Sequence, residues 1–493
     1  MKLRDLISVL NIKEERNISD VEINDVIVDS RKSASGKLFV CIDGFTQDGH
    51  KYIPDAVACD ISALVVTKMP DEDITSGVPV ICVDDSRKAL ALLSDKLYDH
   101  PSGKMDLIGI TGTKGKTTTS YMMRSIYSAW GHETGLIGTI QNMIGEEIIP
   151  TDRTTPEAND LQRLFGEMVS RNIKECIMEV SSQGLHLGRV ACCEYRIALF
   201  TNLSPDHIGP TEHKDMDDYA NAKAKLFEMA EKGVINRDNE YWKVMADKAT
   251  GKVYTYGIDS DDCDFRAVNI LKAADHVEYD VKAKSAEHAD AEVHVYVSIP
   301  GKFSVYNSLS ALVATYLMGV PVDAILQGLK TVFVPGKAET VPTGRDFTVL
   351  IDYAHNPDSF INIITTVKEY AKRTVFLFGC GGDRNRPRAL MGETAGKYAD
   401  FSIITSDNPR TEDPASIVAD LEKGIIPTGA PYICIVDRRE AIHWAVKNAQ
   451  PGDVIILAGK GHETYQIFKD KTIHFDEREV VREALAELEA EGR

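Results

Sequence analysis

The stretch Gly109-Ile-Thr-Gly-Thr-Lys-Gly-Lys-Thr-Thr-Thr119 ends an apolar run that begins at Met105. An apolar strand that opens into a turn of glycine, lysine and threonine surrounds phosphate with backbone N–H groups. Lys116 can neutralise the β- and γ-phosphates of a nucleotide, and the Thr117 hydroxyl can hold Mg²⁺. The match to G-x-x-x-x-G-K-[ST] is imperfect, because Ile110 stands where that pattern has glycine. An ordinary glycine-rich turn is the alternative, but the pattern favours binding of a nucleoside triphosphate.

Length and charge restrict the class of protein. A chain of 493 residues is too long for one hydrophobic core and predicts about three domains. The formal net charge of −19 argues against general nucleic-acid binding, which needs a basic face. Small anionic substrates need only a locally positive pocket.

Several compartment signals are missing from the sequence. The N-terminal residues lack the uncharged core of a secretory signal, and no run approaches roughly 18 apolar residues, so we expect no membrane span. The nine cysteines include no C-x-x-C pair, which indicates reduced thiols rather than a zinc or redox motif. We therefore expect a cytoplasmic protein.

The pattern of apolar runs changes twice along the chain. Short runs separated by turns end at a linker near residues 100–103, and strands alternating with helices then predict a parallel sheet. Alternation over residues 253–299 predicts an antiparallel hairpin, followed by a helix over 306–318 and a hinge at 334–336. We predict an α/β protein of three domains: a small α/β domain (1–103), a central phosphate-loop-type domain with a parallel sheet (104–335) and a C-terminal Rossmann-like domain (336–493).

The C-terminal section contains five apolar runs, each followed by polar, glycine-rich or charged residues. The runs are 347–351, 375–378, 402–405, 432–436 and 454–458. In open parallel sheets ligands gather at the carboxyl ends of the strands. Polar strand ends in two separate sheets predict an active site between domains.

Metal-competent side chains end two more strands of the central section. Glu179 ends one apolar run, and Asp206 and His207 follow the next. Oxygen ligands suit Mg²⁺, and an imidazole can complete a second site. Taken singly, Glu179 could cap a turn and His207 could be a hydrogen-bonded loop histidine. Lys223, within an alanine-rich helical stretch, reads from the residues alone as a surface lysine.

Three charged residues of the C-terminal section follow strands: Arg384, Arg410 and Glu463. The guanidinium of arginine binds a carboxylate through two parallel hydrogen bonds, and a glutamate can receive an ammonium. Together they would suit a zwitterionic amino-acid substrate. Salt bridges between domains are an equally open interpretation.

At this point the motifs resemble a known family along nearly the whole chain. GTKGKTTT, MEVSSQGL, TNLSPDHIG, ANAKAKLF, DYAHNPDS, FGCGGDR, DNPRTEDP and AGKGHETYQ occur in that order. This set, with Asp29-Ser-Arg31 near the N-terminus, resembles the Mur ligases of peptidoglycan biosynthesis, and within them the MurE branch of UDP-N-acetylmuramoyl-tripeptide synthetases.

The resemblance implies an ATP-dependent amide ligase, and it implies roles residue by residue. Residues that would bind ATP are Gly112, Thr113, Lys114, Gly115, Lys116, Thr117, Thr118, Asn307, Arg345, Asp352 and His355. Thr117, Glu179, His207 and Lys223 would serve Mg²⁺, with Lys223 carbamylated (N6-carboxylysine), and Lys116 would act with the last three in catalysis. Ser30 would contact the uridine nucleotide, and Thr154, Thr155, Ser181 and Arg189 the muramoyl peptide. The incoming amino acid would meet Arg384, Asp407, Asn408, Pro409, Arg410, Gly459 and Glu463.

The implied reaction joins meso-diaminopimelate to UDP-MurNAc-L-Ala-D-Glu through an acyl phosphate. In this family D-N-P-R accompanies diaminopimelate, and Arg410 would bind the distal carboxylate that lysine lacks. Family members commonly carry arginine where this chain has Lys337, a change that is not neutral at a bidentate site. The resemblance also implies a monomer.

Three alternatives stay open on the sequence. The same ligase could add L-lysine or another diamino acid. A folylpolyglutamate-synthetase-like ligase would share the phosphate loop but lack the N-terminal domain and D-N-P-R. A non-catalytic nucleotide-binding regulator would show decay of Glu179, His207 and Lys223, all of which are present.

Overall fold

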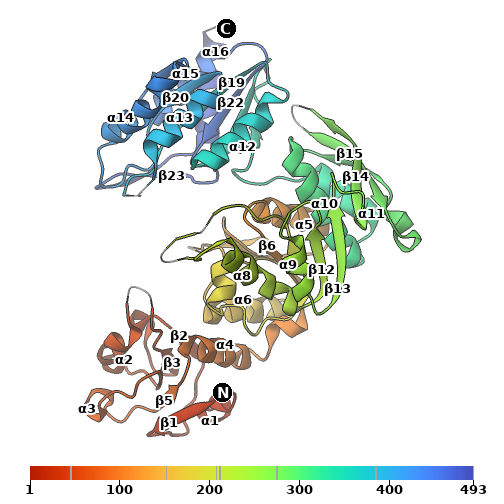
Figure 1. Cartoon of the computed structure of the whole chain (residues 1–493). Helices are drawn as coiled ribbons and strands as arrows, with labels where there is room; N and C mark the ends of the chain where they lie inside the picture. Colours follow the sequence, from red (N-terminus) through yellow and green to blue (C-terminus); the bar gives the residue numbers. More distant parts are fainter. Residues whose placement is uncertain are drawn as a thin grey trace. The chain divides into compact units, whose positions relative to one another are not determined.

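The computed structural model describes residues 1–44, 47–151, 153–206, 208–209, 212–273, 276–383 and 386–491. The chain divides into two compact units, and Figure 1 labels the helices and strands in their order along the chain. The first comprises Met1–Arg266, Lys282–Ala291 and Leu309–Gly328, and the second Ala267–Val281, Glu292–Ser308 and Leu329–Arg493.

The N-terminal part of the first unit is built on a five-stranded sheet of order β1-β5-β4-β3-β2. β1 is antiparallel to β5, and the other pairs are parallel. The strands are β1 (Ile12–Arg16), β2 (Asp25–Ile27), β3 (Lys37–Val40), β4 (Ala63–Val66) and β5 (Val80–Val83), and the helices are α1 (Leu3–Ile7), α2 (Ile53–Ala58), α3 (Glu72–Thr75) and α4 (Ser86–Leu97). β4 and β5 are buried along their whole length, as their uninterrupted apolar sequences require.

The predicted linker is a short 3-10 helix, Pro101–Lys104, that is packed rather than free. Ser102 is buried, its hydroxyl donates to the Cys192 carbonyl, and it accepts a hydrogen bond from the Glu194 backbone N–H. This helix leads directly into β6 (Asp106–Thr111).

The central sheet of the first unit runs in the order β13-β12-β11-β6-β10-β7-β8-β9. The pairs from β13 to β7 are parallel, so the carboxyl ends of β6, β10 and β11 lie along one edge. The remaining strands are β7 (Thr134–Ile137), β8 (Asn142–Ile144), β9 (Glu147–Ile149), β10 (Glu175–Glu179), β11 (Tyr195–Phe200), β12 (Ala230–Asn236) and β13 (Lys252–Gly257), and the helices are α5 (Lys116–Ala129), α6 (Ala158–Ser170), α7 (Ser182–His186), α8 (Met216–Glu228) and α9 (Trp242–Lys248).

The strands of residues 253–299, predicted to form an antiparallel hairpin, pair in two different ways. β15 (Val277–Ala283) and β16 (His294–Val297) are antiparallel, as the alternation predicted. The prediction was wrong for β13, which pairs parallel to β12 and to β14 (Phe265–Lys272). Alternating exposure is compatible with either pairing at the margin of a sheet, so the sequence pattern could not separate them. The predicted helix is α10 (Lys302–Leu317), followed by α11 (Val322–Lys330).

The C-terminal sheet has the order β17-β18-β22-β19-β20-β21, parallel except for β17. Its strands are β17 (Glu339–Val341), β18 (Thr348–Asp352), β19 (Arg373–Phe378), β20 (Phe401–Ile404), β21 (Tyr432–Cys434) and β22 (Asp453–Ala458), with helices α12 (Pro357–Lys368), α13 (Arg388–Tyr398), α14 (Pro414–Ile425), α15 (Arg438–Lys447) and α16 (Glu477–Ala490) and a separate ribbon of β23 (Tyr465–Ile467) and β24 (Thr472–His474). The five predicted apolar runs are the parallel strands β18 to β22.

Each face of this sheet packs on its own core. Phe376 and Phe378 join the cluster that contains side chains of α12, α13 and α14, whereas Val375 and Leu377 join the cluster of α15 and α16. Successive residues of a strand point to opposite faces, so a strand covered on both sides must be apolar at every position.

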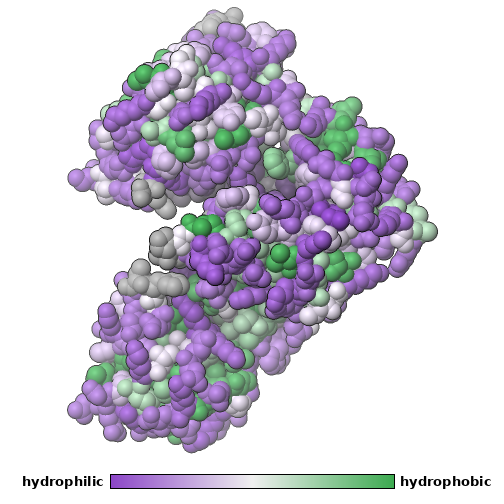
Figure 2. Space-filling view, in the orientation of Figure 1, coloured by the Kyte–Doolittle hydropathy of each residue, from purple (hydrophilic) through white to green (hydrophobic). Residues whose placement is uncertain are grey.

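The surface agrees with the acidic composition. The face shown in Figure 2 is mostly hydrophilic, with apolar residues in small separate groups. Within the described residues no helix is long and apolar enough to cross a membrane. All nine cysteines are free thiols, six of them buried.

Candidate active site

The turn after β6 has the backbone of a phosphate-binding loop. Gly112 has a φ of +150° and Gly115 a φ of +86°, conformations that favour glycine. A Cβ on Gly112 would lie 2.0 Å from the Thr201 hydroxyl oxygen. The loop is held by the backbone N–H of Thr113, which donates to the Asn202 carbonyl at 2.8 Å. α5 begins directly after it, so its free N–H groups open onto the turn.

Two lysines converge on this loop. Lys116 Nζ donates to the carbonyls of Gly112 (2.8 Å) and Thr113 (3.1 Å), and Lys223 Nζ donates to the same Gly112 carbonyl at 2.9 Å. The Lys116 ammonium beside this glycine turn forms a local positive centre in an acidic protein, which suits a polyanion.

The interpretation of Lys223 as a surface lysine was wrong, because only 1% of the residue is exposed. Burial, reinforced by the nearby Lys116 charge, holds the pKa of Lys223 well below its ordinary value. The signal was present in the sequence: Tyr219, Lys223 and Phe227 are spaced by four and share the buried face of α8.

Glu179 ends β10 beside the phosphate loop and is 1% exposed. Its Oε2 accepts from the hydroxyls of Thr117 (3.0 Å) and Thr139 (2.9 Å), and its Oε1 accepts from the Thr139 N–H (3.1 Å). Glu179 therefore does cap a turn, and it also brings a carboxylate to the Thr117 hydroxyl.

This oxygen pair fits the donor set of Mg²⁺. Within the described part of the chain no group of three His, Cys, Asp or Glu residues could hold a metal ion. His207, predicted as a ligand, lies outside the described residues.

The predicted peptide-binding residues of the first unit lie next to Glu179. Thr154 Oγ1 is 3.0 Å from Thr139 Oγ1, and Thr155 Oγ1 donates to the Glu179 carbonyl at 3.0 Å. The Ser181 N–H donates to Thr155 Oγ1, and Arg189 donates to the Thr155 carbonyl at 3.1 Å and pairs with Glu157 at 3.0 Å. These four residues therefore lie in one neighbourhood, and their binding of the muramoyl peptide stays a prediction.

Ser30 is remote from that neighbourhood in the sequence and begins a 3-10 helix, Ser30–Lys32, in the N-terminal part. Asp29 caps this helix by accepting from the Arg31 backbone N–H at 3.0 Å, and its carboxylate pairs with the Arg31 guanidinium. The cap fixes the D-S-R turn at the end of β2.

In the second unit, Asp352 and His355 lie at the end of β18. Asp352 accepts from the backbone N–H groups of Ala338 (2.8 Å) and Ala354 (2.7 Å). Burial and the Arg386 charge lower the pKa of His355, so its ring is neutral. Two further residues predicted to bind ATP lie elsewhere in this unit: Asn307 is buried in α10, and Arg345 lies in the turn before β18.

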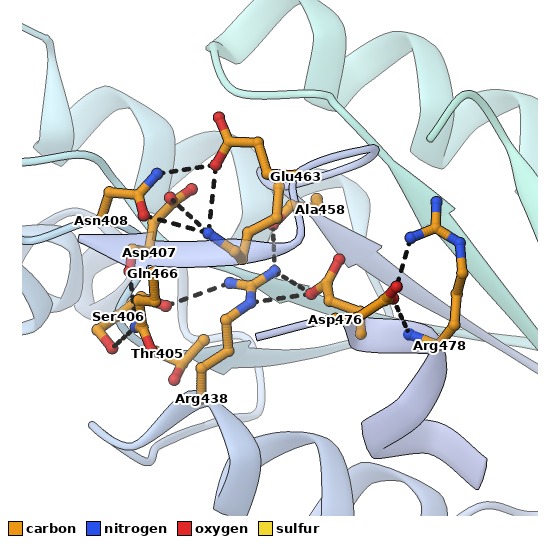
Figure 3. Close-up of polar contacts among 12 residues, drawn as sticks. Thr405, Ser406, Asp407, Asn408, Arg438, Ala458, Glu463, Gln466, Asp476 and Arg478 are labelled. Carbon is orange, nitrogen blue, oxygen red and sulfur yellow. Dashed lines mark hydrogen bonds and ion pairs between the residues drawn. The ribbon is translucent and has the colours of Figure 1, made fainter. Parts of the chain in front are cut away.

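Two loops lie together beyond the carboxyl ends of β20 and β22. They are residues 407–410 (the D-N-P-R loop) and residues 459–463 (the G-K-G-H-E loop). Asn408 Nδ2 donates to Glu463 Oε2 at 2.8 Å (Figure 3). The fully buried Lys460 donates to Asn408 Oδ1 and to Glu463 Oε2, both at 3.2 Å. Sequence reasoning missed Lys460, although its place inside the motif was a signal.

Arg410 is the last residue of the D-N-P-R loop and lies next to this network, but no carboxylate among the described residues pairs with it. Its N–H donates to the Ile467 carbonyl at 3.0 Å, while its buried Nε has no hydrogen-bond partner and the guanidinium forms no ion pair among the described residues. Glu463 pairs with Lys460 of its own loop. Arg384, predicted to act with Arg410, lies outside the described residues.

Gly459 and Pro409 belong to the same pair of loops. Gly459 has a φ of +117°, and a Cβ there would lie 2.6 Å from Asp407 Oδ2. Pro409 packs against Gly382, where a Cβ would lie 1.9 Å from the Pro409 carbonyl oxygen. Lys337, which replaces the family's usual arginine, lies over the ring of Tyr353 with Nζ 5.4 Å from its centre.

The first unit thus contains a parallel sheet with a phosphate-loop turn, and the second contains a parallel sheet whose loops bring cationic and acidic side chains together, as expected of sites for charged ligands. Three family models match the chain: the Mur ligase family catalytic domain over residues 22–98, the Mur ligase middle domain over 110–315, and the Mur ligase glutamate ligase domain over 337–461. The chain belongs to the Mur ligase family, whose members are ATP-dependent ligases.

Full-length relatives share one name. A UDP-N-acetylmuramoyl-L-alanyl-D-glutamate–2,6-diaminopimelate ligase of Caldanaerobacter subterraneus is 48% identical over 99% of this chain and 100% of its own length. The ligase of that name from Clostridium botulinum is 44% identical over 97% of each chain.

Solved structures agree with this family. A structure of a UDP-N-acetylmuramoyl-L-alanyl-D-glutamate–2,6-diaminopimelate ligase matches with a TM-score of 0.72 and 28% identity, covering 100% of this chain and 99% of its own. A Mycobacterium tuberculosis folylpolyglutamate synthase complexed with ADP and AMPPCP matches over 82% of this chain and 95% of its own, with a TM-score of 0.60 and 18% identity, and so shares the fold. The predicted α/β class and three-domain family architecture are confirmed.

Proposed function

We propose that this chain is the ATP-dependent ligase that joins meso-diaminopimelate to UDP-MurNAc-L-Ala-D-Glu and releases ADP and phosphate. The full-length relatives of that name support the reaction. The observation that carries the choice of amino acid is the Arg410 guanidinium, which lies in the D-N-P-R loop without a carboxylate partner among the described residues.

ATP would lie with its phosphates in the turn after β6. Residues 112–118 would supply backbone N–H groups, and Lys116 would leave the Gly112 and Thr113 carbonyls to meet the transferring phosphoryl group. Asn307, Arg345, Asp352 and His355 are the proposed nucleotide contacts of the second unit. The terminal carboxylate of the muramoyl peptide would attack the γ-phosphorus in line, which gives an acyl phosphate and ADP.

Thr117 and Glu179 would hold Mg²⁺, with His207 as a further ligand. Mg²⁺, when bound, would neutralise charge on the phosphate oxygens. The peptide carboxylate would be oriented by Thr154, Thr155, Ser181 and Arg189, which the hydrogen bonds already connect to Glu179. Ser30 would contact the uridine nucleotide.

The environment of Lys223 supports carbamylation. The lowered pKa raises the neutral, nucleophilic fraction of this buried amine, and the neutral amine can attack CO₂ with loss of one proton. The product places an anion beside the Lys116 ammonium, which attracts it, whereas a protonated Lys223 would repel it. The carbamate would then face the phosphate loop.

The amino acid would be selected by the two loops of the second unit. Arg384 and Arg410 would bind the distal carboxylate, and Glu463, with Asp407 and Asn408, would receive the ammonium. L-lysine would leave the half-buried Arg410 guanidinium without a carboxylate partner, a loss that a polar site does not recover elsewhere. The free amine of the bound substrate would attack the acyl phosphate, and phosphate would leave from the tetrahedral intermediate.

The test measures phosphate release by the purified chain with ATP, Mg²⁺ and UDP-MurNAc-L-Ala-D-Glu, with meso-diaminopimelate and L-lysine offered in parallel. Product mass identifies the amide. We expect turnover with diaminopimelate alone. Turnover with lysine would keep the ligase and contradict the role of Arg410, and silence with both would contradict the proposed acceptor. Light scattering on the same preparation would test the prediction that the protein is a monomer. Its cytoplasmic location stays a prediction.

A further inference from the structure

Arg438 is a fully buried arginine that lies away from the predicted ligands. It is the first residue of α15 and is 1% exposed. Its Nε and Nη2 donate to Oε1 of Glu477, the first residue of α16, at 2.9 and 2.7 Å. Both side chains of this ion pair have no exposed surface.

The Arg438 guanidinium also donates hydrogen bonds to the backbone directly before the D-N-P-R loop and directly before the G-K-G-H-E loop. Nη1 donates to the Ser406 carbonyl at 3.3 Å and Nη2 to the Ala458 carbonyl at 2.8 Å. Ser406 directly precedes the D-N-P-R loop, and Ala458 directly precedes the G-K-G-H-E loop. One guanidinium thus holds the starting points of both loops.

The two strands that lead into these loops each pair with β19 but do not pair with each other. Ser406 follows β20 and Ala458 ends β22, and β19 lies between these strands in the sheet. No backbone ladder therefore joins them. The guanidinium is planar and rigid, so its simultaneous bonds to both carbonyls tie together two loop beginnings that do not pair directly.

The contacts across the two loops depend on that distance. Asn408 on one loop donates to Glu463 on the other at 2.8 Å, and Lys460 donates back to Asn408 at 3.2 Å. A displacement of about 1 Å breaks such bonds, and misplacement on that scale is costly to a reacting geometry.

We propose that Arg438, paired with Glu477, is a positioning residue for the amino-acid site: it sets the spacing of the D-N-P-R and G-K-G-H-E loops. The inference rests on the proposed function of those loops. A buried ion pair with no such role would be replaceable by apolar side chains of similar size without loss of stability or activity.

The test compares the double variant Arg438→Met/Glu477→Met with Arg439→Met, a matched control on the next residue of α15, whose exposed side chain pairs with Glu483. Kinetics measure KM for meso-diaminopimelate, KM for ATP and kcat, and denaturant unfolding measures stability. For the double variant we expect near-native stability, a KM for diaminopimelate raised about 10- to 100-fold and a KM for ATP within about twofold. The control should match the wild type.

Hydrogen–deuterium exchange provides a readout without substrate. In the double variant, backbone amides of residues 405–412 and 459–467 should exchange faster, while those of residues 110–120 should not change. Unchanged exchange and unchanged KM in the folded double variant would overturn the proposal. If the double variant does not fold, Arg438→Lys keeps the charge but cannot reach both carbonyls, and normal KM and exchange there would overturn it equally.

The two proposals fail in different ways. A wild-type chain that is inactive with diaminopimelate would contradict the proposed substrate. Hydrogen–deuterium exchange of the two loops in the variants would still test whether Arg438 positions them. An active wild type with an unaffected double variant would contradict only the role of Arg438.

Discussion

At the scale of single residues, the site depends on charges placed where the fold leaves them incompletely compensated. Arg410 has a buried Nε without a hydrogen-bond partner among the described residues, and its backbone φ is +54°. Lys223 is buried beside Lys116, with a strongly lowered pKa. An uncompensated group of this kind costs stability in the free protein and is best explained by what it binds.

Arg410→Ala should abolish use of diaminopimelate while ATP binding is kept, because only the distal carboxylate loses its partner. Arg410→Asn is the matched variant, since asparagine tolerates the left-handed backbone of this position. Amide formation is measured with diaminopimelate and nucleotide affinity by titration. Normal ligation by either variant would contradict the specificity argument.

Lys223→Ala should lose ligase activity and regain part of it when a small carboxylate such as acetate or propionate is added, because the added anion takes the place of the carbamate. Activity is followed against carboxylate concentration, with chloride at equal ionic strength as the control. The wild-type mass after mild isolation should include one CO₂. A fully active Lys223→Ala chain would remove the carbamate from the mechanism.

At the scale of elements, the strand ends decide where chemistry gathers. Apolar runs predicted β18 to β22 and the turn after β6, because strands buried on both faces must be continuously apolar. The spacing of loops on β20 and β22 could not be predicted, since it depends on Arg438 and Glu477 of two later helices. Lys223 was missed for the opposite reason: its helical spacing was visible, but its charge suggested the surface.

Gly112→Ala should disable the phosphate loop, because the new Cβ would lie 2.0 Å from the Thr201 hydroxyl in a conformation that disfavours side chains. We expect kcat/KM for ATP to fall by about 100-fold or more, as for a misplaced binding loop. The control is Gly131→Ala, which has a φ of +85° and nothing within 4 Å of the new Cβ. Gly131→Ala adds backbone strain of about 1 kcal/mol but no steric clash. Equal losses of kcat/KM in both variants would therefore contradict the role of the clash with Thr201.

At the scale of the whole molecule, the G-K-G-H-E loop, which is proposed to bind the amino acid, also contributes to the stability of the folded protein. His462 of the G-K-G-H-E loop is largely buried near Lys337 and Arg478, and burial with these cations lowers its pKa from 6.5 to about 4. The folded state therefore favours the neutral ring. Its stabilising contribution is present above the ordinary pKa and is lost as pH falls from 6.5 towards 4.

His462→Asn should consequently flatten the acid side of the stability profile. The free energy of unfolding is measured by denaturant titration from neutral pH down to about 4 for the wild type and the variant. The exposed His474→Asn serves as the control. A wild type and a His462→Asn variant that lose stability in parallel would contradict this assignment.

The sequence by itself determined the family, the α/β class and the neighbourhood of the phosphate loop, because these depend on local patterns: apolar runs, glycines where φ is positive and motifs at strand ends. Tertiary structure alone decided that β13 pairs in parallel, that Lys460 joins Asn408 to Glu463, and that Arg438 spans two strands that are not neighbours. Contacts between distant segments arise only when the elements pack, so no local pattern contains them.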